Sequence, residues 1–167
     1  MTRIIPIDVT ISNVTKRTSG AYREKYGCDA VFTSVAPEIQ TDGTATLSGV
    51  EEDVQLVFNL KTTSFPMNKK TYNCGFPAAY NTSFWIARKT APPPQANNAP
   101  PFKGNGKLDG QFDVETRSTD REAILNDANT DGQEYEYCLI VDFQLGGATK
   151  SIVIDPVIIN RKPGADI

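Results

Sequence analysis

Oxygen-bearing side chains at alternate positions form the arrangement in this sequence that most directly suggests chemistry. Asp127, Asn129 and Asp131 stand two positions apart, and Gly132 follows them. The first half of an EF-hand calcium loop has this pattern, because alternate side chains of a tight loop converge on one ion and glycine permits the sharp turn. The last position of such a loop is a bidentate glutamate, whereas this chain has Cys138 there. An ordinary EF-hand is therefore excluded.

A calcium site of another kind remains open to the same loop, and calcium is the one cofactor that the sequence suggests. Its ligands would be Asp127, Asn129, Asp131 and either Glu134 or Glu136. The alternative is a turn without metal, in which Asn129 or Gly132 is left-handed and the aspartates accept hydrogen bonds from nearby backbone amides. Half-motifs of this kind recur in turns rich in Asn, Asp and Gly, so both interpretations stand.

Aromatic side chains gather between residues 65 and 85, among several asparagines. The rings belong to Phe65, Tyr72, Phe76, Tyr80, Phe84 and Trp85. Stacked rings with amide donors suit a sugar or a small planar ligand. Adjacent residues of a strand point to opposite faces, so we expect either Phe84 or Trp85 to lie outside the core, under a loop, a ligand or a neighbouring subunit. The candidate ligand or interface residues are Trp85, Phe84, Tyr72 and Tyr80.

Catalysis has little support in this sequence. The chain has no histidine, which removes Ser–His–Asp and Cys–His nucleophilic sites. The acidic run 51–53 is most simply an exposed turn, and Asp113 with Glu115 is most simply the solvated side of a strand. We therefore expect no enzyme activity.

Length and charge favour one ordinary globular domain over residues 1–167. A net charge of −3 and the lack of a Lys/Arg cluster disfavour nucleic acid as a partner. No apolar run near the start is long enough for a signal peptide or a membrane span, which predicts a cytoplasmic protein without membrane contact. The odd set Cys28, Cys74 and Cys138 lacks metal-ligand spacing, so we expect buried free thiols.

Alternating apolar residues predict an all-β fold. Ile5, Ile7, Val9 and Ile11 would share one buried face, and so would Val54, Leu56, Phe58 and Leu60. Further strands are expected near residues 30–35, 44–47, 84–88 and 111–115. About eight strands suit a two-sheet antiparallel β-sandwich.

The last third of the chain predicts a β-hairpin. Residues 135–143 and 151–160 are rich in β-branched and aromatic side chains, and Gly146-Gly147 lies between them. Pro156 cannot donate a ladder hydrogen bond, so we expect an edge strand or a bulge there.

One short helix and one loop interrupt the predicted strands. Thr119 stands three residues before Glu122 in a capping-box arrangement, which predicts a helix of at most two turns up to Leu125. Residues 91–101 read APPPQANNAPP, and so many prolines predict a surface loop.

The two ends of the chain resemble a known family. The segments Pro6-Ile7-Asp8-Val9-Thr10-Ile11-Ser12 and Ile154-Asp155-Pro156-Val157-Ile158-Ile159-Asn160-Arg161 are similar to those of the DP-EP family of small prokaryotic β-sandwich proteins. A similar closing strand with an Asp-Pro step also occurs in AidA/PixA-type inclusion body proteins. The resemblance implies a bacterial antiparallel sandwich whose last strand bends at Asp155-Pro156, and neither family implies catalysis.

Two functions of different classes follow. The first is a non-enzymatic structural or interaction protein, which self-associates or binds another protein through edge strands and the Trp85 region. The alternative is a ligand-binding sandwich, which holds a sugar in the aromatic 65–85 region or calcium in the 127–132 loop.

Overall fold

The computed structural model describes residues 1–18, 25–88, 111–155 and 157–160, and these form an all-β structure. The strands are β1 (Arg3–Lys16), β2 (Tyr26–Thr33), β3 (Ala45–Thr46), β4 (Val54–Leu60), β5 (Ser64–Met67), β6 (Lys70–Gly75), β7 (Phe84–Arg88), β8 (Phe112–Glu115), β9 (Glu122–Asp127), β10 (Glu134–Leu145), β11 (Ala148–Ile154) and β12 (Val157–Ile159). A single 3-10 turn, η1 (Tyr80–Thr82), is the helical element of the described residues.

The strands belong to one mixed sheet, so the predicted two-sheet antiparallel sandwich of about eight strands is wrong. The described strands form a 12-stranded sheet with the order β3-β12-β10-β11-β2-β1-β4-β9-β8, while β7 and β6 also pair with β10, and β5 pairs with β6. The pairs β1–β4, β11–β2 and β12–β3 are parallel. The pair of Tyr26 with Ile152 joins the two halves into one sheet. Alternation within a strand does not specify its neighbours, which explains the error.

The predicted short helix is also wrong, because residues 122–127 form strand β9. Ala123 and Leu125 are buried and Ile124 pairs with Val57 of β4, so the segment follows the period of a strand. The hydroxyl of Thr119 accepts a hydrogen bond from the backbone amide of Arg121 over 3.2 Å, which makes it part of a local turn. The proline-rich stretch 91–101 lies outside the described residues, and the single domain over 1–167 stays a prediction.

The hairpin predicted near the C-terminus is confirmed. Leu145 of β10 pairs with Ala148 of β11, and Gly146 and Gly147 between them have φ values of 59° and 82°. Two consecutive positive φ values fit the two-residue turn that matches the twist of antiparallel strands. Strand β12 continues along β10 and also pairs with β3, so it is not an edge strand, and Pro156 lies outside the described residues.

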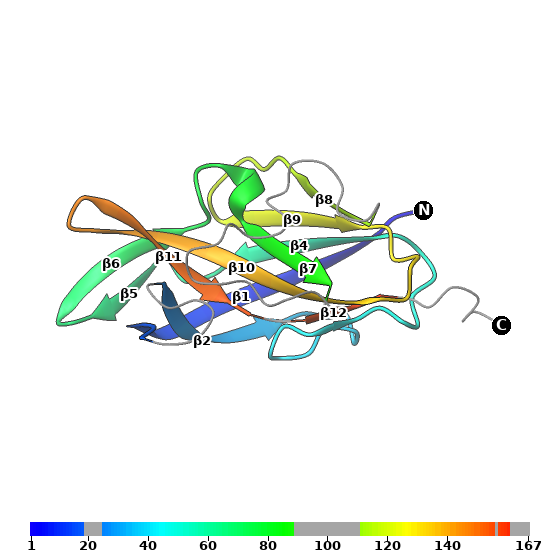
Figure 1. Ribbon diagram of the computed structural model, residues 1–167, viewed down its shortest axis with the longest axis horizontal. Helices are drawn as coiled ribbons and strands as arrows, with labels where there is room; N and C mark the ends of the chain where they lie inside the picture. Colours follow the sequence, from blue (N-terminus) through cyan, green and yellow to red (C-terminus); the bar gives the residue numbers. More distant parts are fainter. Residues whose placement is uncertain (19–24, 89–110, 156, 161–167) are drawn as a thin grey trace.

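The hydrophobic core lies between the parts of this sheet that face each other. The predicted inward face of β1 is confirmed, since Ile5, Ile7, Val9 and Ile11 are at most 4% exposed. In the view of Figure 1, β7 and β10 lie over β1 and β4. Phe58 of β4 accordingly contacts Phe84 of β7 and Tyr137 of β10, with ring centroids 5.5 and 5.8 Å apart.

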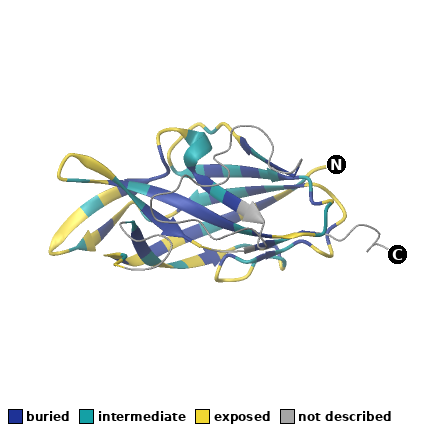
Figure 2. Ribbon diagram, in the orientation of Figure 1, coloured by how far each residue is buried: buried dark blue, intermediate teal, exposed yellow. Residues whose placement is uncertain are grey.

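The two ends of the long axis differ. The tips of the β5–β6 and β10–β11 hairpins extend to one end, and the N-terminus lies at the other (Figure 1). Exposed residues are concentrated in these tips and in the loops, whereas the middle of β10 is buried (Figure 2). Among the described residues, no helix is long and apolar enough to cross a membrane.

Candidate functional site

The structure separates the two aromatic residues of β7. Phe84 is fully buried in the core, whereas Trp85 is partly exposed on the opposite face and packs against a second apolar cluster. That cluster consists of Cys138, Ile140 and Val153. The expectation that only one of the two neighbours lies in the main core is confirmed.

The other two aromatic candidates are dispersed. Tyr72 of β6 stacks on Phe65 with ring centroids 5.8 Å apart, and Tyr80 lies in η1. Both pack against the core from partly buried positions. The four predicted residues are therefore spread over three elements, and a role in ligand binding stays a prediction for them.

The loop after β9 has the local hydrogen bonds of the metal-free turn. Asp127 Oδ1 accepts a bond from the Asn129 amide over 2.9 Å, and Asp131 Oδ1 accepts one from the Gln133 amide over 3.1 Å. Asn129 and Gly132 are both left-handed, with φ values of 55° and 64°. Glu134 is exposed at the start of β10. Calcium binding by this loop stays an untested alternative to the metal-free turn.

Asn129 is a structural clamp between two loops. Its side-chain amide donates to the carbonyl oxygens of Leu47, Val50 and Glu52 over 3.4, 2.8 and 3.2 Å. Because Asn129 is fully buried, water does not compete for these hydrogen bonds. The clamp holds the acidic loop 48–53 against the turn that follows β9.

Asn160 completes this buried polar network and was missed as a site residue by sequence reasoning. Its side-chain amide nitrogen lies 3.1 Å from Asp127 Oδ1, 3.3 Å from Asp131 Oδ1 and 3.4 Å from Gln111 Oε1. Three oxygens therefore surround one amide group. Burial raises the pKa of Asp127 to about 7, against the lowering effect of its bonds from Asn129 and Asn160. In the described parts of the chain, no group of three or more His, Cys, Asp or Glu side chains is placed to hold a metal ion.

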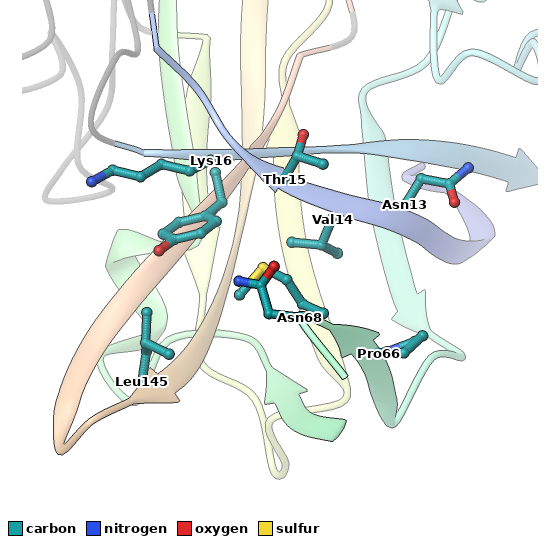
Figure 3. Close-up of a pocket in the computed structure, with 9 residues that line it drawn as sticks. Asn13, Val14, Thr15, Lys16, Pro66, Asn68 and Leu145 are labelled. Carbon is teal, nitrogen blue, oxygen red and sulfur yellow. The ribbon is translucent and has the colours of Figure 1, made fainter. Parts of the chain in front are cut away.

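A hollow of about 560 Å³ opens at the hairpin-tip end (Figure 3). It is lined by Asn13, Val14, Thr15, Lys16, Tyr26, Pro66, Met67, Asn68 and Leu145. The register of β1 shifts between Ser12 and Thr15, where Asn13 has a φ of 53°, so a β-bulge shapes this end of the strand. No pattern in the sequence indicates the hollow, because four separate segments contribute to it.

A row of apolar side chains crosses the outer face of the sheet. Pro6 of β1 pairs with Val57 of β4, and Val57 pairs with Ile124 of β9. Val35 lies beside Pro6 and is 94% exposed, and Ile4 on the same face is 63% exposed. We name Ile4, Pro6, Val35, Val57 and Ile124 the outer apolar row. The alternation in the sequence indicated the buried face of β1 and did not indicate this row.

Polar contacts flank the outer apolar row. Lys61 lies 3.9 Å from Asp8, and Gln55 donates to Glu115 and Asn126 over 2.9 and 3.1 Å. An apolar centre with a polar rim is the common anatomy of a protein–protein interface.

Comparison with known proteins finds similarity to solved structures. No protein family and no curated protein matches the chain. The inclusion body protein PixA from Burkholderia cenocepacia J2315 is 10% identical, with a TM-score of 0.36, over 95% of this chain and 96% of that chain. Its name agrees with the AidA/PixA-type resemblance, and the DP-EP resemblance stays a prediction. A TM-score of 0.36 is too low to indicate a shared fold, so the proposals below rest on the residues of this chain alone.

Proposed function

We propose that this protein is a non-enzymatic structural protein that associates with copies of itself through the outer apolar row. The observation that carries the proposal is the exposure of this row, in which Val35 is 94% and Ile4 63% exposed. Pro6 is also exposed, and Val57 and Ile124 are half-buried. Contiguous apolar side chains on an open sheet face favour burial, and a second copy supplies a matching surface.

The geometry of the row suits a two-fold contact. A two-fold axis along the row places Pro6, Val57 and Ile124 of one copy on the same residues of the other, because an isologous interface repeats one patch. The polar rows on either side then face each other across the rim. Glu115, at the end of the row, accepts a hydrogen bond from Gln55 and lies at the border of this contact.

The surroundings of the titratable groups support a role without catalysis. Asp127, whose pKa is raised, is 1% exposed and therefore closed to a substrate. Burial also raises the pKa of Asp142, whose carboxylate is bonded by the Ser151 hydroxyl over 3.0 Å. With no histidine in the chain, neither group has the usual partner for proton transfer.

The test is native mass by light scattering and sedimentation over about a hundredfold range of protein concentration. We expect the mass to rise with concentration. The double variant Val57→Lys, Ile124→Lys places two charges in the row and should weaken association at least about tenfold, because each desolvated charge is unpaired.

Two matched variants identify the surface. Thr10→Lys adds a charge at an exposed position of β1 outside the row and should leave the mass unchanged. Trp85→Ala tests the outer face of β7, and a loss of association confined to that variant would assign the contact to that face instead. A monomer at every concentration would contradict self-association.

A further inference from the structure

The charges of this elongated molecule are separated along its long axis. Lys69 and Lys70 are exposed at the tip of the β5–β6 hairpin, and Lys16 lines the hollow at the same end. Lys25 directly precedes Tyr26, which also lines the hollow, so basic side chains gather at this end although the chain has a net charge of −3. Asp29, on the same end, accepts a hydrogen bond from Asn13 over 2.7 Å.

The opposite end carries a concentrated negative charge. Glu51, Glu52 and Asp53 are consecutive and exposed, and the Arg3 backbone amide donates to the Asp53 carbonyl over 2.9 Å, which places them beside the N-terminus. Arg3, a cation at this end of β1, is held by both carboxylate oxygens of Glu38 over 2.7 and 2.9 Å. The Asp53 carboxylate accepts a hydrogen bond from the Thr2 hydroxyl over 2.7 Å.

We propose that copies of the chain also bind end to end, with the acidic loop 48–53 of one copy in the hollow between the hairpin tips of the next. This inference rests on the proposed function, to which it adds a second contact. The partner is a second copy because the two ends of one molecule have opposite charge and lie at opposite ends of its long axis (Figure 1).

The hollow has the chemistry that an acidic loop requires. Lys16 and Asn68 line it, and their side chains carry ammonium and amide groups that donate hydrogen bonds to carboxylates (Figure 3). Lys69 follows Asn68 in the hairpin turn. Buried Val14 and half-buried Met67 form an apolar base beneath them. A concave site with an apolar base and a few polar groups is a common form of binding site.

The acidic loop is fixed before it binds. The buried amide of Asn129 holds the carbonyls of Leu47, Val50 and Glu52, and the Val50 amide donates to the Leu47 carbonyl over 3.0 Å. A loop held in one conformation loses less entropy on association. The clamp therefore gives the buried polar network a role in binding, which is to hold the backbone of the acidic loop in one conformation.

An end-to-end contact joins two different surfaces and is open-ended. Each copy keeps a free acidic end and a free basic end, so a chain of copies can grow until it is capped. Because the contact is between exposed charges, its strength should fall steeply with ionic strength. The contact through the outer apolar row should be much less sensitive to salt.

The experiment uses Ile124→Lys as background, so that association through the outer apolar row is weakened. Sedimentation velocity at about 0.02 M and about 0.5 M salt should show association that weakens by about tenfold or more at high salt. Two charge-reversed proteins are compared, namely Lys69→Glu, Lys70→Glu and Glu52→Lys, Asp53→Lys. Each alone has two ends of like charge and should be monomeric.

Mixing the two reversed proteins gives the decisive result. Every end then again finds an opposite charge, so the mixture should associate as the parent does. Thr10→Glu, which adds a negative charge at an exposed position of β1 outside both contacts, is the matched control and should retain association. If thermal melting shows that Lys69→Glu, Lys70→Glu perturbs folding, the milder pair Lys69→Gln, Lys70→Gln replaces it. This pair should cause a partial loss of association.

The outcomes separate the two proposals. The end-to-end contact is overturned if the association of the Ile124→Lys protein survives both charge reversals, or if the mixture stays monomeric. Neither outcome contradicts association through the outer apolar row. If the unsubstituted protein is monomeric at all concentrations and both salt levels, self-association itself fails and the end-to-end contact fails with it.

Discussion

The side-chain amide of Asn160 donates to Asp127 over 3.1 Å, although the two residues are 33 positions apart. Among the described residues, the second oxygen of Asp127 and the amide oxygen of Asn160 have no hydrogen-bond partner. A proton on Asp127 gives its second oxygen a hydrogen to donate, and an uncharged carboxyl group costs less to bury. Burial therefore favours the protonated form of Asp127, against the hydrogen bond from Asn160, which favours the carboxylate.

We expect stability to fall as the pH rises from about 4 to about 7. Burial raises the pKa of Asp127 from 3.8 to about 7, so the folded chain keeps this proton after the unfolded chain has released it. The stabilisation is fully present below the unfolded pKa and is lost as the pH passes the folded pKa, by up to about 4 kcal/mol. Urea unfolding at several pH values measures this slope.

Asp127→Asn is the control for that slope. The amide has the same shape and no titration in this range, so the difference between the two proteins isolates Asp127 from other carboxyl groups. Glu38 and Asp42, whose pKa values are lowered, contribute in the opposite direction in both proteins. Parallel pH profiles of the two proteins would show that Asp127 is ionised in the folded state.

Calcium should leave the melting temperature unchanged. The carboxylate oxygens of Asp131 already accept bonds from Gln133, Asn160 and the Tyr135 hydroxyl, so an ion would have to displace these donors. Thermal melts with calcium and with a chelator test this expectation. A rise in melting temperature that disappears in Asp131→Asn would establish the calcium site that the spacing of the loop suggests.

The core contact between β4 and the strands that cover it should dominate stability. Phe58 is fully buried and its ring contacts Phe32, Phe84 and Tyr137. Phe58→Ala should therefore lower the free energy of unfolding by about 3–5 kcal/mol. Val35→Ala, at a 94% exposed position, should change it by less than about 0.5 kcal/mol. Similar losses in both variants would place the core elsewhere.

Local patterns predicted the strands better than their arrangement. Alternation identified the buried faces of β1 and β4, because each strand has one face toward the core. The parallel pair of Ile7 with Phe58 joins segments that are far apart in sequence, and no local signal encodes it. The capping-box pattern at Thr119 wrongly predicted a helix. The non-local pairing of β9 with β4 outweighs a weak helix signal over a few residues.

The candidate site was predictable only where one loop contains it. The turn after β9 was foreseen from Asp127 to Gly132, but its tertiary partners Asn160 and Gln111 come from other segments. The hollow and the outer apolar row each combine side chains of separate strands. Their residues become neighbours through sheet order, which alternation does not determine.

The thiols should react slowly in the folded protein. Burial raises the pKa of Cys28 to about 12 and also raises that of Cys74, although Arg17 and Arg121 act in the opposite direction. The thiolate is the reactive form, so alkylation near pH 8 should be slow for both residues and fast in denaturant. Mass spectrometry after timed alkylation measures this difference. Rapid modification of Cys28 in the native protein would show that its thiolate is stabilised.

Two substitutions of similar size at Gly146, in the β10–β11 turn, should differ in how much they lower the stability of the protein. Gly146 has a φ of 59°, and a Cβ placed there would meet no atom within 4 Å, so the cost of a side chain is conformational. Asparagine tolerates this left-handed backbone and is common in such turns, so Gly146→Asn should be nearly neutral. Gly146→Val should destabilise the protein by about 1–2 kcal/mol, because a β-branched residue is strained there. Urea unfolding of both variants measures the two costs, and equal costs would show that the turn is not held in this conformation.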